Sequence, residues 1–321
     1  MRRRHAMALP GLLLLPRAGA AQESYPNRPV RLVVPYPAGG TTDIMGRVLA
    51  QRLSDRWRQP VVVDNRVGAG GSIGTDHAAR ATPDGYTLVM GNSASHGANV
   101  LLSNAPTYDP VRDFAAISML AIVRQMLVVH PSVPATNVRE LVELAKARPG
   151  ALTFSSSAVG GAPHMAGELF KLVAKIDLLH VPYNGAAPAL NALLAGDVTM
   201  LFGSVPTVAE ISRTGRIRAL AMASGSRSAL LPELMTMAEA GFAGVEMDSW
   251  NGLFAPAGTP PAIIGKINAD LRAALDGEEM RARLAELGFE RATGSAEDLA
   301  AHVASELVRV RKLIQDAKIS G

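Results

Sequence analysis

Residues 30–47 read VRLVVPYPAGGTTDIMGR, and this stretch decides the fold that we expect. It opens on a valine-rich apolar run, which predicts a buried strand at residues 30–34. Prolines and the pair Gly39 and Gly40 interrupt the run over residues 35–41, and apolar residues then recur at helical spacing from about Thr42. A helix that begins just past a strand points free backbone N–H groups above the sheet edge, where they favour an anion. No side chain here suits covalent chemistry, so the stretch indicates binding rather than catalysis.

Two further copies of this strand–loop–helix unit are predicted in the middle of the chain. A strand at 152–155 precedes the loop SSAVGGA and Pro163, which favours the first turn of a helix. A strand at 178–181 precedes the loop PYNGA and a helix that ends at Gly196. The alternation predicts an α/β fold of mostly parallel sheets flanked by helices, with ligands beyond the carboxyl ends of the strands.

The chain is expected to cross between two domains. Residues 117–129 are a long apolar stretch with Arg124 and Gln125 in its middle, which we interpret as a strand that leaves one domain and enters another. The segment WNGLFA at 250–255 is predicted to cross back. We therefore expect hinges at 123–125 and 250–253. The predicted domains are 22–123 with 246–321, and 124–245.

The N-terminus has the layout of a secretory signal peptide. Three arginines at positions 2–4 precede a short apolar run that ends in small residues around Ala20. The run is too short to span a bilayer. We expect residues 1–21 to be removed and the mature protein to lie in the periplasm.

The mature chain is predicted to be electrically neutral. The 321 residues contain 32 Lys and Arg and 28 Asp and Glu, and four of the arginines fall within residues 1–20. Their removal leaves 28 of each sign, so the basic field that attracts polyanions is absent and no nucleic-acid partner is expected. The sequence contains no cysteine, which excludes disulfides, thiolate metal sites and cysteine nucleophiles.

Two patterns in the sequence are typical of catalysis or metal binding, and both are incomplete. GGSIG at 70–74 matches a nucleophile elbow around Ser72, the alternative being a serine hydrolase of α/β type, but an elbow needs a strand running directly into its first glycine. His164 and Glu168 have the i, i+4 spacing of two metal ligands, yet no further ligand has convincing spacing. We expect no enzyme activity, no metal and no cofactor.

The loops that follow the strands carry the groups that suit a carboxylate. Hydroxyls and amides come from side chains such as Thr41, Ser157 and Asn184, while glycines such as Gly40 and Gly161 expose backbone N–H groups. Such neutral donors can hold a carboxylate directly or through water.

Seven segments in order along the chain carry a resemblance to a known family. They are YPNRPVRLVVPYPAGGTTD (25–43), NRVGAGGSIG (65–74), PDGYTL (83–88), YDPVRDF (108–114), SSAVGGAPHMAGELF (156–170), HVPYNGAAPAL (180–190) and SWNGLFAPAGTP (249–260). They cover essentially the whole mature chain. In them the protein resembles the Bug-type extracytoplasmic solute receptors, the substrate-binding components of tripartite tricarboxylate transporters, or TctC family.

The resemblance implies a two-domain Venus-flytrap fold, of the type II-like periplasmic binding proteins, that traps a small carboxylated solute at the domain interface. Its first jaw would be residues 36–43 and its second 155–164 with 183–187, and Asp43 would fix its loop rather than touch a like-charged ligand. The ligand-binding residues expected on this basis are Tyr36, Ala38, Gly39, Gly40, Thr41, Asp43, Ser93, Ser155, Ser156, Ser157, Gly160, Gly161, His164, Tyr183, Asn184, Gly185, Ala186, Ala187 and Trp250.

The resemblance also indicates the partners. The solute would be a small organic acid, whether a carboxylate, a dicarboxylate, an amino acid or an aromatic acid. The receptor would act as a monomer and serve membrane permease subunits or a sensor protein. The family commonly has acidic residues where this chain has Ala192, Thr199 and Gly203. We expect Gly203 to face the cleft, so that a polar contact to the solute is missing there.

Overall fold

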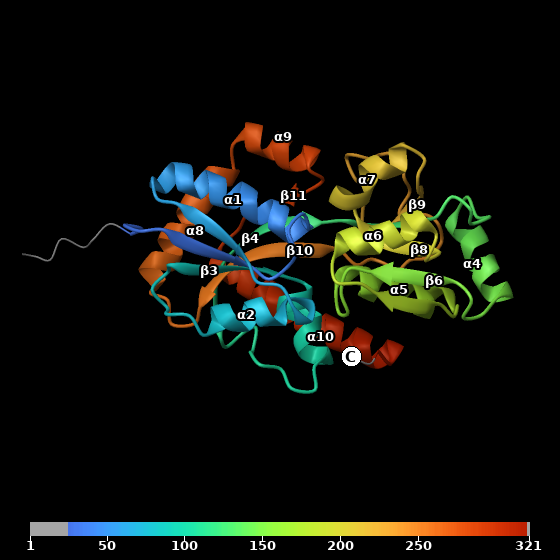
Figure 1. The fold of residues 1–321 in the computed structure, drawn as a ribbon, viewed down its shortest axis with the longest axis horizontal. Coiled ribbons are helices and arrows are strands. Elements are labelled where there is room, and N and C mark those ends of the chain that lie inside the picture. Colours follow the sequence, from blue (N-terminus) through green and yellow to red (C-terminus); the bar gives the residue numbers. More distant parts are fainter. Residues whose placement is uncertain (1–24, 320–321) are drawn as a thin grey trace, which may run out of the picture.

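The computed structural model describes residues 25–319, and the predicted signal peptide lies outside the described residues. The described chain forms two lobes side by side, each built on one sheet (Figure 1). The first lobe is the sheet with strand order β11–β4–β10–β3–β1–β2 and its helices, and the second is the sheet β7–β6–β8–β5–β9 and its helices.

The strands have the following bounds. The first sheet contains β1 (Val30–Val34), β2 (Val61–Asn65), β3 (Thr87–Asn92), β4 (Phe114–Val123), β10 (Ser249–Pro256) and β11 (Glu290–Arg291). The second contains β5 (Gln125–Val129), β6 (Thr153–Ser156), β7 (Leu179–Pro182), β8 (Met200–Ser204) and β9 (Arg218–Met222).

Helices cover both faces of each sheet. The first lobe has α1 (Thr41–Trp57), η1 (Ala69–Gly71), α2 (Ser72–Ala79), η2 (Ala94–Ala98), α3 (Asn99–Leu102), α8 (Pro261–Leu275), α9 (Glu278–Glu286) and α10 (Ala296–Ala317). The second has α4 (Val138–Ala147), α5 (Ala162–Ala174), α6 (Ala186–Ala195) and α7 (Val205–Arg213).

The strand β1 confirms the first prediction and shows why its residues are nearly all apolar. Val30, Leu32 and Val34 pack against α1, α8 and α9, while Val33 faces the opposite core beside α2 and α10. A strand covered on both faces needs apolar side chains on both. The helix α1 follows after a loop of six residues, with Gly40 at its N-cap.

Both sheets are mixed rather than mostly parallel. The strands of the strand–loop–helix units pair in parallel, β1 with β2 and β3, and β6 with β7 and β8. The strands next to the crossings, β10 and β5, run antiparallel to their neighbours. The chain enters the second sheet through β5 coming from the first lobe, and it enters the first sheet through β10 coming from the second lobe. Each of these strands therefore runs opposite to the strands beside it.

The first crossing lies where the sequence predicts it. Val123 ends β4 in the first sheet, and Gln125 begins β5 in the second. The second crossing differs from the prediction, because residues 250–253 lie inside β10, paired with β3 and β4. A strand held on both edges cannot act as a hinge, so the return passage lies before Ser249. The extents of the two domains remain a prediction.

The last helix, α10, touches both lobes. Leu299 and Val303 pack with Trp250 in a core of the first lobe. Val310 and Leu313, further along the helix, pack in the core that contains Phe170 of the second lobe. Figure 1 shows α10 running beneath both sheets. Within residues 25–319, no helix is long and apolar enough to cross a membrane.

Candidate ligand-binding site

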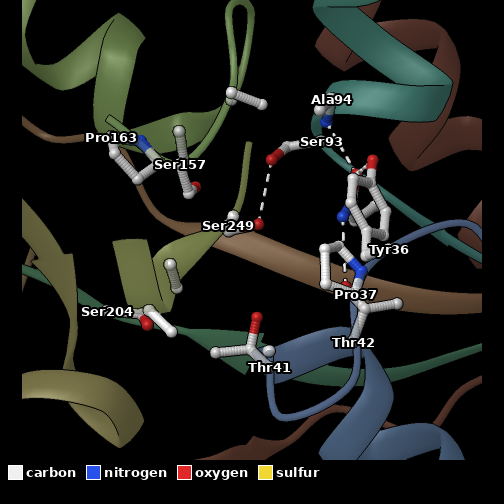
Figure 2. Close-up of a pocket in the computed structure, with 18 of the residues that line it drawn as sticks. Tyr36, Pro37, Thr41, Thr42, Ser93, Ala94, Ser157, Pro163, Ser204 and Ser249 are labelled. Atoms are coloured by element: carbon white, nitrogen blue, oxygen red, sulfur yellow. Dashed lines mark hydrogen bonds between the residues drawn. The ribbon is translucent and has the colours of Figure 1, made fainter. Parts of the chain in front are cut away.

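A cavity of about 110 Å³ lies between the two lobes (Figure 2). The first lobe lines it with the loop before α1, the end of β3 and the start of β10. The second lines it with the starts of β5, α5, α6 and α7. The lining residues are Tyr36, Pro37, Ala38, Gly40, Thr41, Thr42, Asn92, Ser93, Ala94, Gln125, Ser157, Ala158, Gly161, Ala162, Pro163, Gly185, Ala186, Ala187, Pro188, Ser204 and Ser249.

Four helix N-termini meet at this cavity. The N-cap residues of α1, α5, α6 and α7 are Gly40, Gly161, Gly185 and Ser204, and all four line it. None of the four helices has a side-chain hydrogen bond at its cap. The N–H groups of a first helical turn have no partner within the helix, and the helix dipole is positive there. The cavity is therefore polarised to receive an anion.

The lining carries no side chain that is charged at neutral pH. It consists of backbone, small apolar side chains, four serines, two threonines, one tyrosine and two amides. A carboxylate would be held by neutral donors, without a lysine or arginine. Among the described residues no group of three His, Cys, Asp or Glu could hold a metal ion.

Asn92 joins the first-lobe loops around the cavity. Its Oδ1 accepts hydrogen bonds from the Tyr36 hydroxyl at 2.8 Å and from the Ala94 N–H at 2.9 Å. Its Nδ2 donates to Thr42 Oγ1 at 3.2 Å. The hydroxyls of Ser93 and Ser249 share a hydrogen bond of 2.9 Å (Figure 2). These bonds fix the wall before any solute arrives.

Asp43 holds the loop of the first jaw from behind. Its side chain is 3% exposed, and its carboxylate accepts from the N–H of Gly39, from Asn65 and from Arg47, each at 2.9 Å. Burial raises the pKa of Asp43, but these hydrogen bonds outweigh it and hold the pKa below its usual value. Asp43 does not line the cavity, which agrees with a positioning role.

A stack of aromatic rings supports the second jaw. His164 lies on His180 with ring centroids 4.0 Å apart, and His180 lies on Phe154 at 4.7 Å. The N–H of Gly160 donates to His164 Nδ1 at 3.1 Å, which requires a neutral imidazole. Burial lowers the pKa of His164 to about 3, with His180 and Lys171 adding to the effect. The histidine thus fixes the loop and does not line the cavity.

The structure divides the nineteen expected residues into three groups. Ten line the cavity: Tyr36, Ala38, Gly40, Thr41, Ser93, Ser157, Gly161, Gly185, Ala186 and Ala187. Tyr183 and Asn184 line an adjoining cleft of about 720 Å³, which shares Tyr36 and Gly185 with the cavity. The other seven do not line the cavity: Gly39, Asp43, Ser155, Ser156, Gly160, His164 and Trp250.

Three of the residues outside the lining, Ser155, Ser156 and Trp250, contact other parts of the protein instead of the cavity. Ser155 is fully buried and donates to the carbonyl of Ala189, and Ser156 bonds the carbonyl of Ala158 and the ring of His180. Trp250 is 2% exposed in the core of the first lobe, where its ring meets His302.

Sequence reasoning missed the side of the cavity where the chain crosses between lobes. Gln125 and Ser204 are register partners on β5 and β8, and Ser249 is the partner of Val123 on β10 and β4. Pro37, Ala158, Ala162 and Pro163 also line the cavity, within the predicted jaws at 36–43 and 155–164, and Pro188 lines it from one residue beyond the predicted jaw at 183–187. The pair of polar residues inside the apolar stretch 117–129 was the available signal for Gln125.

The three positions that depart from the family pattern lie away from the cavity. Ala192 is buried in the core under α6, and Thr199 bonds Thr153 across neighbouring strands. The prediction that Gly203 faces the cleft is wrong. A Cβ built on Gly203 would point at Val208 of α7, 2.5 Å away. The next residue of β8, Ser204, is the one that lines the cavity.

The surroundings of Ser72 do not form a nucleophile elbow. The strand β2 ends at Asn65, and the turn η1 (Ala69–Gly71) precedes Ser72, the first residue of α2. The required strand directly before the glycine is missing.

Comparisons with known proteins agree with this geometry. The family model described as "Tripartite tricarboxylate transporter family receptor" (TctC) matches residues 45–319. Protein BugT of Bordetella pertussis is 37% identical over 301 residues, 93% of this chain and 92% of BugT. A UPF0065 protein from the tcbD–tcbE intergenic region of Pseudomonas sp. (strain P51) is 36% identical over 321 residues, 99% of this chain and 95% of the relative.

Solved structures show the same fold. The R. palustris protein Rpa4515, determined with adipate, is 38% identical with a TM-score of 0.89 and covers 92% of this chain and 99% of its own. MatC from Rhodopseudomonas palustris, with bound malate, is 31% identical with a TM-score of 0.84, and the match covers 90% of this chain and 100% of MatC. The periplasmic binding protein BugD is 33% identical with a TM-score of 0.86, and the match covers 92% of this chain and 99% of BugD. The two-lobed fold is that of periplasmic binding proteins, and the chain belongs to the TctC family of tripartite tricarboxylate transporter receptors, of the Bug type.

Proposed function

We propose that this protein is a periplasmic receptor that captures a small organic acid in the cavity between its lobes and catalyses no reaction. The convergence of four helix N-termini, one from the first lobe and three from the second, on a cavity without charged side chains carries the proposal. The N–H groups at the starts of α1, α5 and α6 suit a carboxylate, held directly or through water. At α7 the first N–H, that of Val205, donates to the carbonyl of Arg124, so this helix contributes mainly its dipole. The adipate and malate bound by two solved relatives support it.

The two jaws would close on the solute by a hinge at the crossings between the lobes. The first jaw is residues 36–43, and the second is residues 155–164 with 183–187. A solute that touches both jaws stabilises the closed arrangement, because only there are all the donors within reach. The loaded receptor would deliver its solute to a membrane permease or report it to a sensor protein. Loss of uptake in a strain lacking the receptor distinguishes the first role from the second.

Differential scanning fluorimetry tests the proposal. Protein that has been unfolded, dialysed and refolded, to remove any solute acquired during expression, is screened against mono-, di- and tricarboxylates and amino acids. A solute at 100 times its Kd stabilises the folded state by about 2.7 kcal/mol, which raises the unfolding midpoint by several degrees. The diamide of each active acid serves as the uncharged control. If no acid raises the midpoint, and mass spectrometry finds none in freshly purified protein, the proposal fails.

A further inference from the structure

A wall built by both lobes lies between the cavity and the adjoining cleft. Five residues border both spaces, Tyr36 and Pro37 from the first lobe and Ser157, Ala158 and Gly185 from the second. A Cβ built on Gly185 would lie 3.4 Å from Pro37 Cγ, which is van der Waals contact across the interface between the lobes. The ring of a proline is fixed to its own backbone and cannot swing aside. The lobes therefore meet where the cavity borders the cleft.

Each lobe holds its part of this wall in place. The hydroxyl of Tyr36 donates to Asn92 Oδ1 at 2.8 Å. A Cβ built on Gly71 would lie 2.7 Å from Tyr36 Cζ, so the ring lies against the backbone of the turn η1. In the second lobe, the N–H of Gly185 donates to the carbonyl of Ser157 at 2.9 Å. The wall is therefore opened by moving the lobes apart and not by turning one side chain.

The cavity is too small for an aromatic ring together with a carboxylate. A benzene ring alone occupies a protein cavity of about 150 Å³. The cavity has about 110 Å³, whereas the cleft has about 720 Å³. A ring attached to a carboxylate at the helix starts would have to extend beyond the cavity, and the cleft is the adjoining space with room for it. The wall lies in that path.

The chemistry of the cleft does not reject a ring. No charged side chain lines it, and Val100 and Leu102 contribute apolar surface. Val67 from the first lobe and Val159 from the second also line it, and they are 48% and 38% exposed. Apolar lining of this kind suits an aromatic group. The exclusion of a ring therefore depends on the wall.

From this geometry we infer that the contact between Pro37 and Gly185 restricts the receptor to short acyclic acids and excludes acids with an aromatic body. The inference rests on the proposed function and refines it from organic acids in general to compact ones. An aromatic acid would have to keep Pro37 and Gly185 apart. The helix starts of the two lobes would then be separated as well, and fewer donors would reach the carboxylate. Selection of this kind works by repelling the wrong solute.

Isothermal titration calorimetry on refolded protein tests the inference with acids that differ by one phenyl group. The pairs are propionate with 3-phenylpropionate, succinate with each enantiomer of phenylsuccinate, glutarate with 3-phenylglutarate, and any further acid found by fluorimetry with its phenyl derivative. We expect each acyclic acid that binds the wild type to bind at least about tenfold more tightly than its phenyl partner, because the added ring does not fit the packed wall.

The substitution Pro37→Ala should relax this selection. It removes the Cγ that meets Gly185 and keeps the carbonyl that accepts from the Gly40 N–H. For at least one pair, the ratio of the two affinities should shift by about tenfold or more in favour of the phenyl acid. A ratio within one variant does not depend on how much of that variant is folded. Pro106 lines the cleft but not the cavity, so Pro106→Ala is the matched control and should keep the wild-type ratio.

The outcomes separate this inference from the proposed function. Wild-type protein that binds a phenyl acid as tightly as its acyclic partner overturns the inference and leaves the receptor function standing. An unchanged ratio in folded Pro37→Ala also overturns it, because the exclusion then arises elsewhere. If Pro37→Ala does not fold, the wild-type ratio alone decides. The absence of binding by any acid overturns both proposals.

Discussion

Gly40 leaves the start of α1 uncovered at the cavity. It is the N-cap residue, with φ −76° and ψ 165°, a conformation open to any residue. A Cβ built on it would lie 3.5 Å from the carbonyl oxygen of Pro37, which is ordinary contact. Backbone strain therefore does not require a glycine here. Its lack of a side chain keeps the first N–H groups of the helix available to a solute.

The substitution Gly40→Asp should separate binding from folding. Aspartate is a favoured N-cap residue but glycine is only slightly worse, so stability should stay the same or rise by roughly 0.3 kcal/mol. Its carboxylate would occupy the N–H groups and repel an anionic solute, and we expect affinity to fall by about 100-fold or more. Calorimetry with the acid found by fluorimetry measures the affinity, and thermal unfolding measures the stability.

Gly277→Asp is the matched control for this change. Gly277 is the N-cap of α9, with φ −64°, and a Cβ there would meet nothing within 4 Å. It does not line the cavity, so its substitution should leave solute affinity unaltered. Unchanged affinity in Gly40→Asp itself would remove the loop before α1 from the site.

The sequence predicts which loops line the cavity, but it is less successful in predicting which individual side chains do so. Ser155, Ser156 and Ser157 are consecutive, yet only Ser157 lines the cavity. The strand β6 ends at Ser156, so Ser155 and Ser156 are held within the second sheet, whereas Ser157 lies in the loop beyond it. Ser204 and Ser249 join the cavity through strand register across the crossing, which no local pattern reveals.

Among the elements, α5 depends on buried neutral histidines. Burial lowers the pKa of His164 to about 3 and that of His180 to about 4, well below the ordinary value of about 6.5. The unfolded chain takes up these protons below pH 6.5, while the folded chain does so only near pH 3 to 4. Stability is therefore unaffected above pH 6.5 and is lost as the pH falls below it.

Urea unfolding between pH 7 and pH 5 should show this loss. Each buried histidine contributes up to about 1.4 kcal/mol per pH unit to the slope. In His164→Asn, the amide oxygen can still accept from the Gly160 N–H but does not titrate, so the slope should become less steep by about that amount. His130→Asn, at a partly exposed histidine beside Ser132, controls for a general effect of removing an imidazole. A slope in His164→Asn equal to that of the wild type would contradict the account.

Element boundaries follow from the sequence wherever local chemistry sets them. The polar pair at Arg124 and Gln125 marks the break between β4 and β5. The helix α6 starts at Ala186, and Pro188 lies in its first turn. Proline is tolerated anywhere in a first turn because those N–H groups have no partner within the helix, so it locates the turn but not its first residue.

For the whole molecule, the lobes touch each other beside the cavity. A Cβ on Gly160 of the second lobe would lie 2.6 Å from Asn99 Oδ1 of the first, and a Cβ on Gly185 would lie 3.4 Å from Pro37 Cγ. The two lobes are therefore in direct contact beside the cavity. Sequence patterns predict two lobes but cannot predict this contact, because it depends on how the sheets are oriented and on α10, whose residues pack against both.

The substitution Gly160→Leu should hold the lobes apart. The added side chain would meet Asn99 across the interface, so small-angle scattering should show a larger radius of gyration in the presence of solute than for the wild type. We expect affinity for the solute to fall by about tenfold, since closure then costs energy.

The variant Gly215→Leu is the control that distinguishes a steric block between the lobes in Gly160→Leu from strain of the backbone. Gly215 has φ +75° against +77° for Gly160, and a Cβ there would meet nothing within 4 Å. Both variants should lose similar stability from the positive φ, but only Gly160→Leu should resist compaction. Identical scattering of the two variants with solute would place the closing contact elsewhere.

The backbone construction of the cavity has a consequence for how such a receptor changes over time. A peptide N–H belongs to every residue except proline, so substitutions around the four helix starts can replace side chains without deleting the donors that face the cavity. Anion capture of the proposed kind would then survive mutations that abolish a site built on arginine or lysine. Preference among solutes, set by the side chains around those donors, could drift independently of it. A single scaffold of this type can therefore be redirected to a new nutrient by very few mutations.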